Sequence, residues 1–286
     1  MKIIAKNDYN EMKQFINMLR NQKRDFEIHQ TSHSTTINFK GNSFLFVNKI
    51  SSNMTFSAFN MIKKDIVKSG IEIDRIPRFD IRYFSINEFL RSQSELPDEC
   101  YLIDINSAYL TCLLNAQMIT KETFERVSHW GKEVRLKSVG MLATNKNILK
   151  YKEGKLIGHE IKSDEYLRNY FFYCCYQTGE VMNKIADELG DEFLFYWVDG
   201  IFIKSKDKVK IVQSLLNSHG FHSKTKSLKE VRFKNEKDNM HFSYLDELRN
   251  KRKKYVIPYF DEENSRNFKD FINSLSKERQ EKFHQI

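Results

Sequence analysis

Proline, glycine and cysteine are all scarce in this chain, and each shortage argues against a class of protein. Three prolines and ten glycines among 286 residues leave little room for flexible linkers. The four cysteines, Cys100, Cys112, Cys174 and Cys175, show neither a C-x-x-C pair nor the spacing of zinc ligands. This usage is typical of a protein in a reducing cytosol and argues against a disulfide scaffold.

The sequence also lacks a long apolar run. No stretch approaches the roughly 18–20 residues that a membrane-spanning helix needs, and the N-terminus has no signal-peptide core. We therefore expect a compact cytoplasmic protein of one or two domains that has no membrane partner.

Positive charge, in contrast, is in excess. The net charge of +9 and the pI near 9.1 indicate a polyanionic partner, with nucleic acid as the first candidate. Aromatic residues make up 13% of the chain and could serve either the core or the stacking of bases. A hydrophobic content of 40% is enough for an ordinary core.

The apolar pattern of the first half predicts a mixed α/β structure. Residues 1–50 read as a small α/β unit with strands and one helix, followed by a helix over about 56–68. We expect irregular structure over 71–97. A helix begins near Thr120, and its apolar pattern continues to Leu142.

The second half contains the strongest periodicity of the chain. Apolar residues repeat at helical spacing over about 163–189, which is typical of core packing. The run Phe193–Ile203 predicts a β-hairpin, with Asp199-Gly200 as a turn dipeptide because glycine tolerates positive φ. A helix over about 206–218 and strands after Phe221 complete the order of a ferredoxin-like sheet.

Two carboxylates lie in this predicted sheet, Asp104 near the end of an apolar run and Asp199 at the hairpin. If the two runs are neighbouring strands, the two side chains can hold two divalent metal ions, the minimum for two-metal phosphoryl transfer. Asp199 could also serve turn geometry alone, and Asp104 could be a helix cap.

Three motifs in this region resemble those of family B DNA polymerases, in particular the protein-primed phage and plasmid type. Asp104-Ile-Asn-Ser107-Ala-Tyr109 resembles the first palm motif, and Tyr196-Trp-Val-Asp199-Gly-Ile resembles the third. The segment 132–143 between them is similar to the basic fingers motif. The resemblance covers about residues 98–235.

The resemblance implies a role for each matching residue. Asp104 and Asp199 would be the catalytic carboxylates that bind two Mg²⁺ or Mn²⁺ ions, with Ile105 as a further metal contact. Tyr109 would pack under the sugar and exclude a 2′-hydroxyl. The other implied nucleotide contacts are Ser107, Lys132, Arg135 and Lys137. The alternatives are that Tyr109 belongs to the core and that the basic residues form a solvated helix face.

Basic residues near the C-terminal end are predicted to bind the backbone of a primer–template. A solvated surface is the alternative. These residues are Lys224, Lys226, Arg232, Lys234, Arg249, Lys251 and Arg252.

The chain also departs from the family pattern. Leu110 stands where a proline usually follows the tyrosine, Trp197 stands in place of a second hairpin carboxylate, and Lys137 replaces an asparagine. Residues 1–97 are too few for the usual proofreading exonuclease. We therefore expect a reduced member that lacks proofreading.

Together these observations predict an α/β (α+β) protein with a ferredoxin-like polymerase palm. Its parts would be an N-terminal α/β unit (1–97), a palm (98–114 and 156–240), short helical fingers (115–155) and a helical thumb-like tail (241–286). The predicted activity is metal-dependent nucleotidyl transfer to a nucleic-acid 3′ end, with DNA-directed DNA synthesis as the first choice.

The expected partners are primer–template DNA, dNTPs and a protein primer or accessory replication proteins of a phage or mobile element. Two other functions stay open at this point. One is a non-catalytic nucleic-acid-binding module derived from a palm, and the other is a two-metal nuclease.

Overall fold

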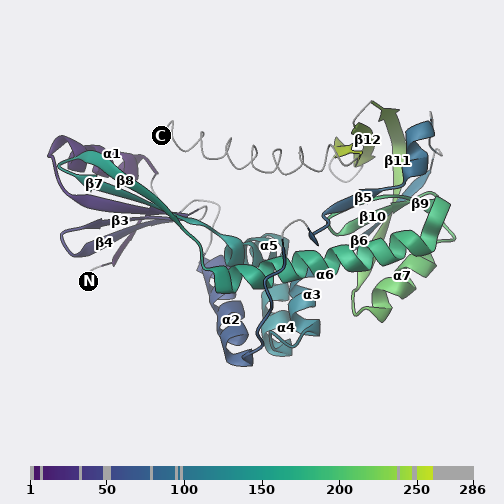
Figure 1. Ribbon diagram of the computed structural model, residues 1–286, viewed down its shortest axis with the longest axis horizontal. Helices are drawn as coiled ribbons and strands as arrows, with labels where there is room; N and C mark the ends of the chain where they lie inside the picture. The colour runs from purple at the N-terminus through teal and green to yellow at the C-terminus, as the bar shows by residue number, and fades with distance from the viewer. Residues whose placement is uncertain are drawn as a thin grey trace. The chain divides into compact units, whose positions relative to one another are not determined.

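The chain forms two compact units, and it passes through each of them twice (Figure 1). The first unit is Met1–Tyr83 with Asn106–Val181, and the second is Phe84–Ile105 with Met182–Ile286. The computed structural model describes residues 3–6, 9–31, 34–47, 53–77, 80–93, 96, 99–236, 239–246 and 250–259.

A six-stranded sheet dominates one part of the first unit. Its order is β1-β4-β3-β2-β7-β8, with β1 and β4 parallel and the other neighbours antiparallel. Its strands are β1 (Ile3–Lys6), β2 (Phe26–Gln30), β3 (Ser34–Phe39), β4 (Asn42–Val47), β7 (Lys146–Lys152) and β8 (Lys155–Lys162).

Helix α1 (Tyr9–Asn21) buries its apolar side against this sheet. Leu19 of α1 packs into one cluster with Phe26 and Ile28 of β2. Because side chains alternate along a strand, Glu27 lies on the opposite, polar face. The predicted α/β character of residues 1–50 is confirmed within the described residues.

The hairpin β7–β8 crosses the predicted boundary between the fingers (115–155) and the palm (156–240). β7 pairs with β2 in a register that sets Ile28 opposite Leu149, so this hairpin extends the N-terminal sheet. The predicted boundaries at 97, 115 and 155 therefore do not coincide with the two compact units. Pairing across more than a hundred residues leaves no local signal in the sequence.

The remainder of the first unit is helical. It contains α2 (Asn53–Ser69), α3 (Ala108–Asn115), α4 (Lys121–His129), α5 (Lys132–Gly140), the 3-10 turn η3 (Met141–Ala143) and the first part of α6 (Glu165–Leu189). The expected continuous helix from Thr120 is wrong. Gly131 adopts φ 88, and this left-handed residue separates α4 from α5.

A seven-stranded sheet forms the second unit, with the order β13-β12-β11-β6-β10-β9-β5 and antiparallel neighbours throughout. Its strands are β5 (Phe84–Ile86), β6 (Cys100–Ile105), β9 (Phe193–Trp197), β10 (Gly200–Ile203), β11 (Ser223–Asn235), β12 (Asn239–Asp246) and β13 (Lys251–Pro258).

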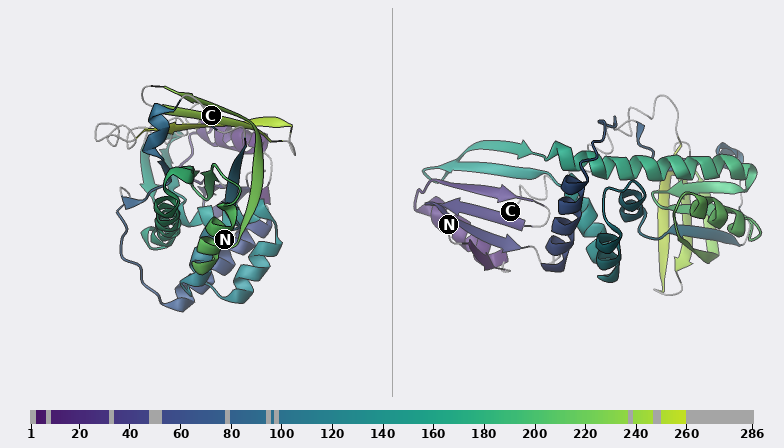
Figure 2. Two further views of the ribbon diagram at one scale, coloured as in Figure 1. Left: turned by 90° about the vertical axis from the view of Figure 1, so that its right-hand side faces the viewer. Right: turned by 90° about the horizontal axis from the view of Figure 1, so that it is seen from below.

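The central four strands have the predicted ferredoxin-like order. The chain runs β6, α6, β9, β10, α7 (Val209–Ser218), β11, and the strands lie in the order β11-β6-β10-β9. The hydroxyl of Tyr196 on β9 donates to Asn183 Oδ1 on α6 at 2.9 Å. In Figures 1 and 2, α7 and the end of α6 lie on one side of this sheet, and β12 and β13 turn over the other side.

Aromatic rings fill the space beneath β13. The Tyr255 ring of β13 lies 6.0 Å from Phe195 of β9 and 5.3 Å from Phe202 of β10. In a flat sheet β13 and β9 would be five strands apart. The sheet therefore curls until its first and last parts share one aromatic core.

Two further expectations need correction here. The segment 71–97 contains β5 and the 3-10 helix η2 (Glu88–Ser92), so it is not irregular throughout. The described part of 241–286 is not helical, because 239–246 and 251–258 are strands. The remainder of the predicted helical tail, 247–249 and 260–286, lies outside the described residues.

Candidate active site

The two predicted catalytic carboxylates lie at one end of two adjacent strands, β6 and β10. Asp104 is the next-to-last residue of β6, and its partner across the sheet is Gly200, the first residue of β10. The backbone N–H of Ile105 donates to the carbonyl oxygen of Asp199 at 2.8 Å. The expectation that the two apolar runs are neighbouring strands is confirmed. Both carboxylates therefore lie at the same end of the sheet.

The turn that carries Asp199 differs by one residue from the expected one. Gly200 already pairs with Trp197, so the two turn residues are Val198 and Asp199. Val198 has φ 57, a left-handed conformation that is rare for a β-branched residue. Gly200 serves close packing instead, since an added Cβ would lie 3.0 Å from Leu102 Cδ1 and 3.8 Å from Asp104 Oδ1.

Trp197, two residues before Asp199, belongs to an aromatic cluster. Its ring stacks on Phe84 of β5 at 5.5 Å and meets Tyr255 of β13 edge-on at 6.3 Å. Aromatic packing thus occupies the place next to Asp199. The hairpin presents a single carboxylate to the site.

Tyr255 is a site residue that sequence reasoning missed. Burial raises the pKa of its hydroxyl, and the negative charges of Asp104 and Asp199 raise that pKa further. The phenol therefore lies within the electrostatic field of both carboxylates. A tyrosine directly after a basic run carries no local signal of such a position, because the position depends on the curl of the sheet.

Lysines from β11 meet carboxylates on the same face of the sheet. Lys224 is the cross-strand partner of Asp104, and its Nζ lies 3.3 Å from Asp104 Oδ2. Lys226, two residues on, has its Nζ 2.6 Å from Oδ1 of Asp246 on β12.

Asp246 is a second residue that the sequence analysis missed. Its side chain is 6% exposed, and its other oxygen lies 3.7 Å from Lys253 Nζ. Both lysines lie over the Tyr244 ring, with Nζ–centroid distances of 5.5 and 5.9 Å. This buried, paired carboxylate fixes Lys226 and Lys253 beside the aromatic core.

The predicted nucleic-acid-binding residues divide between the two faces of the sheet. Side chains alternate along each strand, and the pairing register then assigns each residue to a face. On the carboxylate face lie the predicted Lys224, Lys226 and Lys251, together with Lys253. On the opposite face lie the predicted Arg232, Lys234 and Arg252, together with Lys229 and Lys254. Arg249 lies outside the described residues.

Some of these cations are already engaged. Arg252 donates to the carbonyl of Glu230 at 2.8 Å and to its Oε2 at 2.7 Å, and its side chain is 20% exposed. Lys234 Nζ lies 2.8 Å from Glu236 Oε1 but is 72% exposed. Arg232 and Lys254 are exposed. The face opposite the carboxylates is therefore the more available cationic surface.

The predicted sugar selector and its neighbour belong to the first unit. Ser107 begins α3 with φ 56, and its side chain makes no capping hydrogen bond. Tyr109 of α3 is partly buried and meets Phe171 of α6 edge-on at 5.5 Å. These contacts agree with the core alternative for Tyr109 and leave part of the ring exposed.

The predicted phosphate contacts lie on α5, also in the first unit. The Arg135 guanidinium donates to the Ser128 carbonyl at 2.8 Å, and Lys137 pairs with Glu133 one turn away. Lys132, in the first turn, is exposed. Arg135 and Lys137 thus have structural partners, and Lys132 is the most available cation of the three.

The chemistry of the donor set fits a hard divalent cation. Asp104 and Asp199 offer carboxylate oxygens, which Mg²⁺ and Mn²⁺ prefer, and phosphates and water can complete the octahedron. Among the described residues, no three His, Cys, Asp or Glu side chains gather into a metal-binding group. A metal here would therefore depend on the two carboxylates and on ligands from the substrate.

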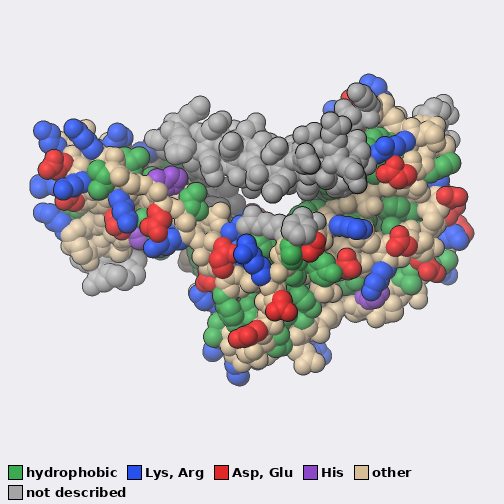
Figure 3. All heavy atoms as spheres, viewed as in Figure 1, with side chains coloured by type: hydrophobic (Ala, Val, Ile, Leu, Met, Phe, Trp, Pro, Cys, Tyr) green, Lys and Arg blue, Asp and Glu red, His purple; other side chains and the backbone are tan. Residues whose placement is uncertain are grey.

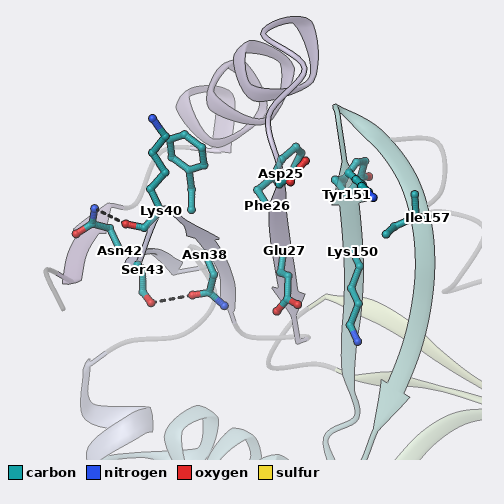
Figure 4. A pocket seen from close by; sticks show the side chains of 13 residues that line it. Asp25, Phe26, Glu27, Asn38, Lys40, Asn42, Ser43, Lys150, Tyr151 and Ile157 are labelled. Carbon is teal, nitrogen blue, oxygen red and sulfur yellow. Dashed lines mark hydrogen bonds between the residues drawn. The ribbon is translucent and has the colours of Figure 1, made fainter.

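A separate hollow lies on the sheet of the first unit (Figure 4). Its volume is about 610 Å³, and its walls come from β2, β3, β4, β7 and β8. Phe26 and Tyr151 stack at 4.4 Å on one side of it, while Glu27 and Lys150 point from the neighbouring strands. No motif of the sequence analysis falls in this hollow.

Charges of both signs are interspersed over the face shown in Figure 3. The net positive charge is therefore not gathered into one continuous area of that face. The clusters of lysine and arginine on β11 and β13 therefore say more about nucleic-acid binding than the net charge of the chain does.

A comparison of the chain with protein-family models found no match, and a comparison with curated proteins found none either. None of the helices in the described part of the chain is both long enough and apolar enough to span a membrane.

Proposed function

We propose that this protein catalyses metal-dependent nucleotidyl transfer to a nucleic-acid 3′ end, with DNA-directed DNA synthesis as its activity. The observation that carries the proposal is the placement of Asp104 and Asp199 at one end of adjacent strands in a split β-α-β sheet. The motifs around both residues resemble the palm motifs of family B polymerases. In this proposal the second unit is a reduced palm.

The carboxylates would hold Mg²⁺ or Mn²⁺, which would activate the primer hydroxyl and neutralise charge on the transferred phosphate. The hydrogen bond from Ile105 N–H to the Asp199 carbonyl fixes the hairpin tip beside β6. This contact holds the backbone of Asp199 beside the end of β6, where Asp104 lies. Such preorganisation lowers the cost of reaching the transition state.

Roles for other residues follow from the resemblance. Tyr109 would contact the sugar, and Ser107, Lys132, Arg135 and Lys137 would contact the triphosphate. Arg232 and Lys254 are exposed on the opposite face of the sheet, where they can bind a phosphate backbone without reading sequence. The strands β12 and β13 would take the place of the predicted thumb.

Primer extension tests the proposal directly. The full-length protein would be incubated with a labelled primer–template, each dNTP or NTP, and Mg²⁺ or Mn²⁺. We expect template-dependent extension that Asp104→Asn and Asp199→Asn each reduce by about a thousandfold or more, because both carboxylates act on the charge that develops in the transition state. The matched control is Asp191→Asn, which changes an exposed carboxylate of the same unit.

The other outcomes assign other functions. Degradation of the labelled strand without nucleotides would identify a two-metal nuclease. Salt-sensitive binding without extension or degradation in either metal would identify a binding module. Equal extension by Asp104→Asn and the wild type would overturn the assignment of the site.

A further inference from the structure

The register of β11 on β6 places a cation at the carboxylate site. Lys224 and Asp104 are direct cross-strand partners, and the Nζ–Oδ2 distance is 3.3 Å. Cross-strand partners project from the same face, so this contact is built into the sheet. The strand register therefore directs a long side chain at position 224, lysine or arginine, toward Asp104.

The neighbouring lysine on this face has a different partner. Lys226 lies one register step away, and its Nζ is 2.6 Å from Asp246 Oδ1. Asp246 holds Lys226 away from Asp104. Lys224 is therefore the cation that the structure pairs with the catalytic carboxylate, among the described residues.

We propose that Lys224 is a built-in counter-ion of Asp104 that competes with the divalent cation for this carboxylate and sets the metal affinity of the free protein. This inference rests on the proposed function. It assigns Lys224 a positioning role at the metal site in addition to the nucleic-acid contact predicted from the sequence.

The competition follows from charge. Asp104 and Asp199 together carry two negative charges, and Lys224 reduces their sum to one. A divalent ion at Asp104 must either displace the ammonium group or accept its repulsion at a few ångströms. The Lys224 side chain is 62% exposed, so it can move aside, and solvent limits the effect to about tenfold in affinity.

The hairpin makes this competition consequential. Trp197 packs against Phe84 and Tyr255, so no further carboxylate stands there to strengthen metal binding. Each of the two carboxylates then contributes a large share of the affinity. When Lys224 neutralises Asp104 in the free protein, the metal ion binds weakly. The ion would bind tightly only together with a triphosphate, which supplies further oxygen ligands.

The test measures Mn²⁺ binding to the full-length protein without nucleotide, by the electron paramagnetic resonance signal of free Mn²⁺. The variants are Lys224→Gln, which removes the charge, and Lys224→Arg, which keeps it. Lys234→Gln is the matched control, because Lys234 is an exposed lysine of the same strand with its own ion pair. Asp104→Asn in the Lys224→Gln background tests whether the ion binds at the proposed site.

We expect Lys224→Gln to bind Mn²⁺ about tenfold more tightly than the wild type, because the variant removes a solvent-screened positive charge beside the ion. Lys224→Arg and Lys234→Gln should match the wild type, and Asp104→Asn should abolish the gain. Equal affinity in the wild type and Lys224→Gln would overturn this inference and leave the proposed function standing. If neither Lys224→Gln nor the wild type binds Mn²⁺ without nucleotide, the inference fails, whereas the proposed function is decided separately by primer extension with Asp104→Asn.

Discussion

Val198 is the residue whose backbone is most at odds with its side chain in the hairpin of the second unit. A β-branched side chain at φ 57 brings Cβ close to the following carbonyl, which costs about 1–2 kcal/mol relative to an ordinary conformation. Strain of this kind persists where the surrounding structure fixes the chain. Here β9, β10 and the Ile105–Asp199 hydrogen bond fix it.

Replacing Val198 with glycine should therefore stabilise the protein. Glycine removes the steric cost but gains freedom in the unfolded chain, so the net increase in unfolding free energy should be about 0.5–1 kcal/mol. The measurement is the midpoint of urea unfolding. Val256→Gly is the control, because Val256 is an exposed strand residue without positive φ, and it should lose about 1 kcal/mol. A destabilised Val198→Gly would show that the turn is not strained.

At the residue scale the sequence reveals the carboxylates but not their partners. Asp104 and Asp199 belong to short motifs with recognisable spacing, so they could be named from the sequence. The contacts of Lys224 and Asp246 depend on which strands pair and in which register. The sequence of a basic run does not show whether its lysines contact solvent, a carboxylate or an aromatic ring.

Among the elements, α2 and α4 are joined by a hydrogen-bonded carboxylate. Asp65 of α2 accepts from the backbone N–H of Thr120 at 2.9 Å and from its hydroxyl at 2.7 Å. Thr120 in turn caps α4 by accepting from Thr123 N–H. Burial acts to raise the pKa of Asp65, but these hydrogen bonds and Lys68 lower it below its ordinary value.

The lowered pKa predicts how stability depends on pH. The folded protein binds the Asp65 proton less tightly than the unfolded chain, so the stabilisation is present above about pH 4 and is lost as the pH falls through the folded pKa. Asp65→Asn should lower the unfolding free energy by about 0.5–1 kcal/mol at pH 7, since the site is partly exposed. The difference should shrink as the pH falls below about 4.

Thermal or urea unfolding at several pH values measures this dependence. Asp187→Asn is the control, because Asp187 is an exposed carboxylate on α6. A gap between wild type and Asp65→Asn that stays constant from pH 7 to pH 3 would contradict the ionic contribution.

Elements with strong local patterns were predicted well, and those that depend on distant partners were not. The periodicity of α6 and the hairpin of β9 and β10 are local, and both are confirmed. The end of α4 is set by Gly131, which a continuing apolar pattern concealed. β5 has three residues and gains its strand conformation by pairing with β9, so no short-range pattern marks it.

At the scale of the whole molecule, neither unit is a single stretch of chain. The first unit's sheet is completed by β7 and β8, which follow the Asp104 motif by some forty residues or more. The predicted N-terminal α/β unit (1–97) is therefore not a separate domain. Removing it would leave β7 without β2, its neighbour in the sheet.

Deleting residues 1–52 should make the remaining chain associate. The deletion exposes the edge of β7 and apolar side chains such as Leu149 that pack on the α1 core. Unpaired strand edges of this kind pair with other chains. Size-exclusion chromatography with light scattering should show oligomers at concentrations where the full-length chain gives a single species. A monodisperse truncated protein of unchanged helix content would contradict this view.

The curled sheet of the second unit also has a consequence for synthesis on the ribosome. Its edge strand β5 ends at Ile86, but the aromatic core closes only when Tyr255 of β13 joins it. At usual rates of translation, roughly ten to thirty seconds separate these two segments. In the last part of that interval, after residue 202 has been added, the nascent chain carries Phe195 and Phe202 without their cover. Exposed aromatic surface of this kind is what chaperones bind. The carboxylate site lies beside this aromatic core. The site therefore reaches its native structure only after β13 has been synthesised.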